Sequence, residues 1–202
     1  MIFTRKMPTT DKNLSEELVT DGWSKIKEPK NLLITISASI PFMFLNAVIT
    51  IWISLQFYKP LETIIASDSF TFNIDLLDVL FFIASSFVLI LVHELTHMLL
   101  IPNFIKSDKT CWGITLNGGF VATTEKILKH RFMMISIMPY FLLSIILPII
   151  LGAFSILNNY IVALIVVNAM ASSVDILNLL LILFQTPKNS YIINNGFETY
   201  FK

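Results

Sequence analysis

The segment FVLILVHELTHMLLI covers residues 87–101 and places two histidines and a glutamate inside an apolar run. A charged side chain at the middle of a bilayer costs about 2.5–3.5 kcal/mol on insertion scales. His93, Glu94 and His97 are therefore candidates for a functional role, provided that this run crosses a membrane. The composition of the chain and its other apolar runs indicate whether this run crosses a membrane.

The composition predicts a membrane protein. Of the 202 residues, 55% are hydrophobic and 14% are charged, whereas a soluble domain averages about 25% charged residues. The mean hydropathy is +0.74. These values argue against disorder, and a net charge of zero gives no basis for a nucleic-acid partner. The single cysteine, Cys111, cannot form an internal disulfide.

Four apolar runs are long enough to cross a bilayer as helices, which takes about 20 residues each. They cover approximately residues 31–57, 76–101, 132–157 and 160–184. We therefore predict an all-α membrane fold with three parts: an N-terminal cytoplasmic segment (1–30), a membrane-embedded domain (31–187) and a cytoplasmic tail (188–202). Prolines inside the runs predict kinks or local breaks at Pro41, Pro139 and Pro148.

The basic residues predict the orientation in the cell membrane. Of the 14 lysines and arginines, all except Lys59 lie before the first run, between the second and third runs, or after the fourth. Cytoplasmic loops carry the excess of basic residues. We therefore expect a multi-pass protein of the cytoplasmic membrane, with both termini in the cytoplasm and the helices in contact with lipid.

The H-E-x-x-H spacing predicts a metal site. In a helix, His93 and His97 differ by about 40° around the axis and by one turn along it, so that both rings can reach one ion. Zn²⁺ is the ion that such a pair usually binds. Glu94 lies on the same half of the helix, where it can activate a zinc-bound water as the general base.

A catalytic zinc usually has three protein ligands. The candidates for the third are Asp175, His130, Cys111 and Glu125. The last three lie in or beside the predicted cytoplasmic connection. Asp175 lies about 15 Å from the cytoplasmic end of its run and His93 about 13 Å from the end of its own, at 1.5 Å per residue. Because these depths agree, Asp175 is the preferred third ligand.

Two asparagines of the last run are candidates for supporting roles at the metal site. Asn168 precedes Asp175 by two helical turns and can donate to an oxyanion, although a helix–helix hydrogen bond is the simpler interpretation. Asn178 lies one turn beyond Asp175 and can orient its carboxylate, or simply pack.

Residues 112–124 predict a strand, a turn at Asn117-Gly118 and a second strand. Because this hairpin directly follows the metal helix, its edge can bind an unwound substrate by strand addition. The alternative is an interfacial loop anchored by Trp112 and Phe120.

Together these features resemble small bacterial membrane proteins grouped as zincin peptidases within a domain family of unknown function. The resemblance rests on the H-E-x-x-H motif, the glycine-containing strand after it, and three further features: Pro139, the stretch from Asn168 to Asp175, and the tail with Gln185-Thr186-Pro187-Lys188-Asn189 and Asn195-Gly196. More distantly, the chain resembles site-2 proteases, although Ile176 follows Asp175 where those enzymes have glycine. The resemblance implies His93, His97 and Asp175 as zinc ligands and Glu94 as general base.

The leading functional hypothesis is a zinc-dependent intramembrane endopeptidase that cleaves a membrane peptide or protein. The alternatives are a non-catalytic adaptor, immunity or assembly protein with a structural metal, and an ion or metal transporter. Structural zinc sites usually fill all four positions with protein ligands, often cysteine. The sequence has one cysteine and no internal repeat of the kind many transporters carry. It has no signal for an oligomeric state.

Overall fold

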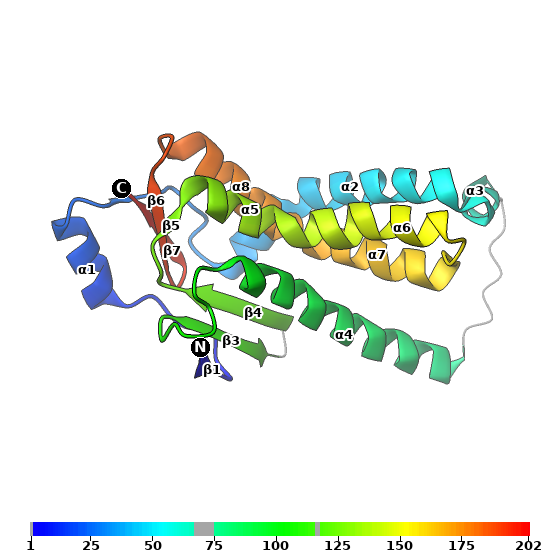
Figure 1. The fold of residues 1–202 in the computed structure, drawn as a ribbon, viewed down its shortest axis with the longest axis horizontal. Helices are drawn as coiled ribbons and strands as arrows, with labels where there is room; N and C mark the ends of the chain where they lie inside the picture. The colour runs from blue at the N-terminus through cyan, green and yellow to red at the C-terminus, as the bar shows by residue number, and fades with distance from the viewer. Residues whose placement is uncertain (1, 67–74, 116–117) are drawn as a thin grey trace.

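The computed structural model describes residues 2–66, 75–115 and 118–202, and shows a mostly helical protein with two small sheets (Figure 1). The four predicted membrane helices are present: α2 (Leu32–Phe57), α4 (Leu76–Leu100), a third running over Lys129–Ala153, and a fourth running over Asn159–Gln185. Each is long and apolar enough to cross a membrane. These helices confirm the predicted fold class and support a multi-pass membrane protein.

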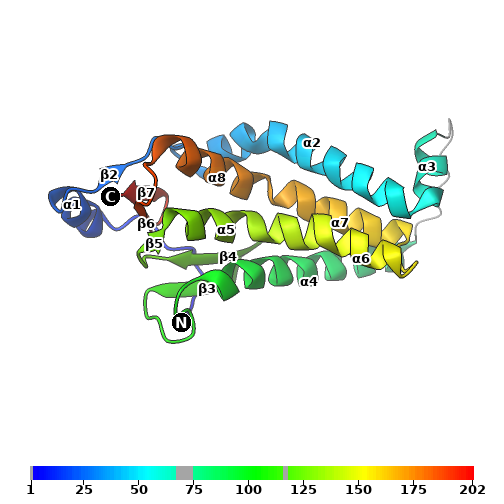
Figure 2. The same cartoon turned by 45° about the horizontal axis from the view of Figure 1, so that its top comes forward.

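The outer faces of these helices are apolar and exposed. Trp52 on α2 and Phe81 on α4 are 63% and 66% exposed. Large hydrophobic side chains at such exposure are stable against lipid and costly against water. A short helix, α3 (Lys59–Ala66), follows α2 at one end of the bundle (Figure 2).

The third span contains a wide helical turn. It consists of α5 (Lys129–Tyr140), a π-helix (Phe141–Ile146) and α6 (Leu147–Ala153). Pro139 lies just before the π-helix and Pro148 in the first turn of α6, so the local irregularity expected there is confirmed. In contrast, α2 continues through Pro41 as one helix.

The fourth span is divided at Ser172 into α7 (Asn159–Ala171) and α8 (Ser173–Gln185), a break that no proline predicts. The Ser172 hydroxyl donates to the carbonyl oxygen of Asn168 (2.9 Å), four residues earlier. Such bonds compete with the regular helical pattern and bend helices. As a result, Asp175 lies in the first turn of a new helix.

Within the described residues, seven strands form a cap at the end of the bundle that carries both chain termini (Figure 1). One sheet has the order β1 (Ile2–Phe3), β3 (Thr110–Thr115), β4 (Gly118–Thr123). The other has the order β2 (Ser24–Lys25), β7 (Glu198–Phe201), β6 (Tyr191–Asn195), β5 (Ile127–Leu128). The hairpin expected over 112–124 is confirmed as antiparallel β3 and β4, and Asn117 of its turn lies outside the described residues.

The N-terminal and C-terminal segments, whose sequences predicted no helix or strand, supply much of this cap. Helix α1 (Lys12–Thr20) places Leu18 in a buried cluster with Trp23, Ile193 and Tyr200. The N-terminal and C-terminal segments therefore share one small core, which lies directly over the cytoplasmic ends predicted for the membrane helices.

Candidate metal centre

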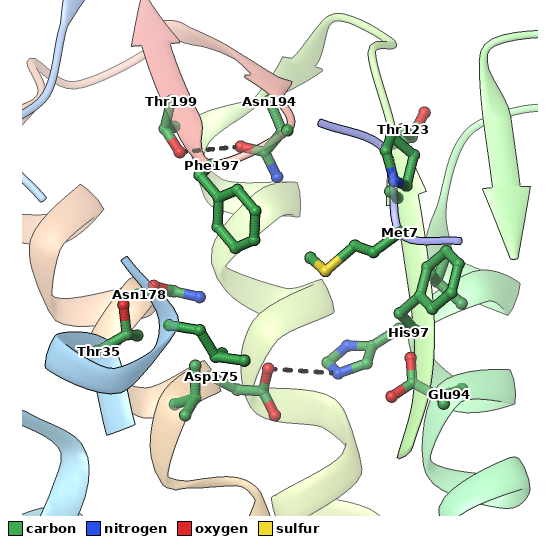
Figure 3. A pocket seen from close by; sticks show the side chains of 18 of the residues that line it. Met7, Thr35, Glu94, His97, Thr123, Asp175, Asn178, Asn194, Phe197 and Thr199 are labelled. Atoms are coloured by element: carbon green, nitrogen blue, oxygen red, sulfur yellow. Dashed lines mark hydrogen bonds and ion pairs between the residues drawn. The ribbon is translucent and has the colours of Figure 1, made fainter. Parts of the chain in front are cut away.

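Two helices bring two imidazoles and one carboxylate together inside the bundle. His93 and His97 come from α4 and Asp175 from α8, and one ligand atom from each lies within 4.8 Å of the others. His93 Nε2 lies 3.2 Å from Asp175 Oδ2, and His97 Nε2 lies 3.5 Å from Asp175 Oδ1. Figure 3 shows His97 and Asp175 facing each other across the cavity. The three residues could hold a metal ion.

The far nitrogen of each ring is held by an oxygen acceptor. His97 Nδ1–H donates to the carbonyl oxygen of Ile135 on α5 (2.8 Å). His93 Nδ1–H donates to Asn168 Oδ1 on α7 (2.9 Å). Metal-binding histidines almost always donate their second N–H in this way, which fixes the tautomer and the direction of the ring.

The orientation of the Asn168 amide supports this assignment. Its Nδ2 donates to Ser144 Oγ (2.9 Å) and to the carbonyl oxygen of Pro139 (3.3 Å). A carbonyl oxygen can only accept. The amide NH₂ must therefore face Pro139, and the amide oxygen must face His93, whose Nδ1 carries the hydrogen. Because Asn168 is only 2% exposed, this network lies out of reach of bulk water.

The tautomers leave a region that attracts a cation. With both Nδ1 atoms protonated, each neutral ring presents the bare lone pair of Nε2 to the Asp175 carboxylate. Two acceptors at 3.2–3.5 Å repel each other unless a cation or a proton lies between them. Tetrahedral zinc with nitrogen and oxygen ligands at about 2.0–2.2 Å separates neighbouring ligand atoms by about 3.3 Å. The two imidazoles and the carboxylate form a donor set that fits Zn²⁺, and each imidazole lies close to that separation from one oxygen of Asp175.

Glu94 lies beside this group and is held by strand β4. The Val121 backbone N–H donates to the Glu94 carboxylate. Gly119 allows the strand to come this close, because a β-carbon at that position would lie 2.6 Å from Glu94 Cγ. The chain thus fixes Glu94 next to the three candidate ligands with a backbone donor, and leaves it outside the cluster itself.

A cavity of about 830 Å³ adjoins these residues, and Glu94, His93, His97 and Asp175 line it together. Other walls come from β4, the start of α2, and the β6–β7 hairpin with Asn194 and Phe197. Asn178, one turn beyond Asp175 on α8, also lines the cavity, and both are labelled in Figure 3. The four polar side chains therefore face one shared cavity.

The other residues considered as a third ligand lie apart from the cluster that the described residues form. His130 is exposed at the start of α5. Glu125 accepts a hydrogen bond from Ser107 Oγ (2.6 Å) in the cap. Cys111 lies on β3 in the cavity wall and is not part of the cluster.

Some residues that support the candidate ligands could not be recognised from the sequence. Ile135 acts through its backbone carbonyl, which every residue type has. Ser144 is a serine in an apolar run, and it accepts a hydrogen bond from Asn168 at its place in the π-helix. Gly119 carried a weak signal, since a glycine in a strand often marks a close approach of another group.

A family model described as "Putative zincin peptidase", DUF3267, matches residues 86–191. This range is more than half of the 202 residues and includes both histidines, Glu94, Asn168 and Asp175. The searches of curated proteins and of solved structures returned no match.

Proposed function

The chain belongs to the DUF3267 family, and from that membership and the geometry of its centre we propose that it is a zinc-dependent intramembrane endopeptidase. Its substrates are peptide segments embedded in the membrane or lying next to it. We place its centre on the cytoplasmic side of the cell membrane, because the basic residues predict both termini there.

One observation carries this proposal: the candidate ligands and a separate carboxylate share a cavity. His93, His97 and Asp175 have their metal-binding atoms within 4.8 Å, and Glu94 lines the same cavity without joining that set. Three protein ligands beside an accessible volume are typical of a catalytic zinc, whereas a structural zinc is closed by four. This favours hydrolysis over the adaptor hypothesis.

Each residue then has a defined task. We assign His93, His97 and Asp175 as the ligands, with Asn168 and the Ile135 carbonyl fixing the two rings. A zinc ion bound there supplies a Lewis acid that polarises the scissile carbonyl and lowers the pKa of water. Glu94 takes the proton from the attacking water and returns it to the leaving amine, which is general acid–base catalysis.

Asn168 is a positioning residue in this scheme. Both of its amide hydrogens have protein partners, Ser144 Oγ and the Pro139 carbonyl, and its oxygen faces His93. This arrangement does not favour the oxyanion role considered for it. Asn178 remains a candidate for orienting Asp175, because it lines the cavity one turn further along α8.

Strand β4 supplies a surface for the substrate. It is an edge strand, since β3 pairs with it on one side only, and residues 119–124 line the cavity. A membrane helix must unwind before its peptide bond can reach the centre. An extended segment can then pair with those edge groups of β4 that do not bind Glu94, and this strand addition satisfies the backbone groups of the segment.

The substitution Glu94→Gln tests the mechanism. It preserves the size of the side chain and removes the base, so we expect zinc content to stay the same and cleavage to fall by about 10²–10⁴. The purified chain in lipid nanodiscs would be incubated with a bacterial membrane fraction, and new peptide N-termini counted by mass spectrometry. Glu125→Gln, in the cap and outside the cavity, is the matched control. Full cleavage by Glu94→Gln would reject the mechanism.

A further inference from the structure

Residues 4–11, which we name the strap, cross the mouth of the cavity. The strap connects β1, beside β3, to helix α1, beside the β6–β7 hairpin. Met7 and Pro8 line the same cavity as His97 and Asp175. Met7 is also 41% exposed, so it lies between the cavity and the outside.

The first anchor of the strap is on β3. The Thr4 N–H donates to the carbonyl oxygen of Trp112 (3.0 Å), continuing the parallel pairing of β1. Gly113 makes this approach possible, because a β-carbon there would lie 1.9 Å from the Thr4 oxygen. No larger residue fits at that position while the strap is in place.

The second anchor is the turn of the β6–β7 hairpin. The Asn195 side chain accepts from the Asp11 N–H (3.0 Å) and donates to the Asp11 carbonyl (2.7 Å). The Phe197 N–H donates to Thr10 Oγ1 (3.3 Å). Here too the approach depends on glycine, since a β-carbon at Gly196 would lie 2.4 Å from the Thr10 nitrogen.

Between the anchors, the strap places a flexible apolar side chain in the cavity. Figure 3 shows Met7 pointing into the space between Phe197 and His97. The neighbouring residues Arg5 and Lys6 are exposed. A segment held at its two ends and exposed in between can open locally at low cost.

We propose that the strap is a cis-acting plug, occupying the groove in which an extended substrate segment lies and leaving it when substrate binds. The Met7 position then defines one subsite, which takes an unbranched apolar side chain next to the metal centre. This inference rests on the proposed peptidase function, because a plug matters only if a substrate enters the cavity. Access to the cavity can nevertheless be measured without any peptidase activity.

The test measures access with a thiol reagent. Asn178→Cys in a Cys111→Ala background places one thiol in the cavity, and Asp108→Cys places one on the exposed cap as a control. In detergent-purified protein, deleting residues 2–9 should speed maleimide labelling at position 178 by about tenfold and leave position 108 unchanged. Melting temperatures of the four proteins show whether the deletion leaves the fold intact.

Substitutions at position 7 give a second series if the deletion unfolds the cap. Met7→Gly empties the cavity mouth and should accelerate labelling at position 178, while Met7→Leu should keep the wild-type rate. Equal labelling rates at position 178 across the folded variants would overturn the plug.

Metal exchange separates this inference from the proposed function. Zinc removal by a chelator should also be faster from zinc-loaded protein that lacks residues 2–9 than from the zinc-loaded full chain. If the wild-type chain binds no zinc, the proposed function fails, whereas the thiol series still decides the plug. If zinc binds and neither labelling nor zinc removal changes, only the plug fails.

Discussion

The two sides of the metal centre are built differently. On α4, His93, Glu94 and His97 lie within two turns of one unbroken helix. On the opposite side, Asp175 lies in the first turn of α8, just after the break at Ser172. The α4 side obtains its geometry from the helical repeat, whereas the α8 side obtains it from the packing of separate elements.

This difference predicts which substitutions act locally and which act through the fold. The α4 residues keep their relative angles wherever the helix lies. Asp175 belongs to a separate helix, and α5 and α7 each pack against both α4 and α8. The Ile135 carbonyl on α5 and the Asn168 amide on α7 orient the two rings. Substitutions on the two sides of the centre therefore test how far the position of Asp175 and the orientation of the two rings depend on the neighbouring helices.

The largest effect is expected for Asp175→Ala. Removing the only carboxylate from the three candidate ligands should weaken zinc affinity by more than about a hundredfold, the upper range for residues that merely support ligands. Zinc affinity would be measured by competition with a fluorescent chelator. The control is Asp78→Ala, which removes a capping-box carboxylate from the first turn of α4 and should leave zinc binding intact. Wild-type zinc affinity in Asp175→Ala would show that Asp175 is no ligand.

A smaller effect is expected for Asn168→Leu. The substitution leaves His93 Nδ1–H without its acceptor, so the ring is free to turn, and zinc affinity should fall by about 10–100-fold. Asn46→Leu is a matched control, because Asn46 is a similarly buried asparagine whose side chain donates to the Ala169 carbonyl and not to a candidate ligand. Equal losses in both variants would indicate a general packing defect instead of a role in orienting His93.

The smallest effect is expected for Gly119→Ala. The added methyl group displaces Glu94, whose Cγ would lie 2.6 Å away. We expect cleavage to fall by about tenfold while zinc content stays constant, since misplacing a catalytic group by about 1 Å costs up to about a hundredfold. Gly152→Ala creates a similar clash with Phe57 at the far end of the bundle and should leave cleavage unchanged. A loss of zinc in Gly119→Ala would mean that β4 supports the ligands as well as Glu94.

Much of the architecture follows from local patterns. The four spans were predicted to within a few residues at each end, because each is a continuous apolar run of sufficient length. The β3–β4 hairpin follows from the strand-turn-strand pattern. The agreement in depth between Asp175 and His93 needed only the ends of two runs and the helical rise.

Other features could not be predicted from local patterns. The break at Ser172 involves a hydrogen bond from its hydroxyl group to the Asn168 carbonyl. A serine in a helix can also point elsewhere, so the residue type alone does not predict a break. The strands β1, β2, β6 and β7 come from polar terminal segments, and pairing between such distant parts of the chain leaves no periodic signal.

The sequence by itself determined the membrane helices and placed His93, Glu94 and His97 on one side of one helix, because hydrophobic length and a fixed helical repeat are local properties. Only the tertiary structure decided which atoms face Asp175, which acceptors hold the rings and what lies over the cavity. Those outcomes depend on backbone carbonyls and on glycines that allow other segments to come close. They also depend on contacts between residues nearly two hundred positions apart, such as Asp11 and Asn195.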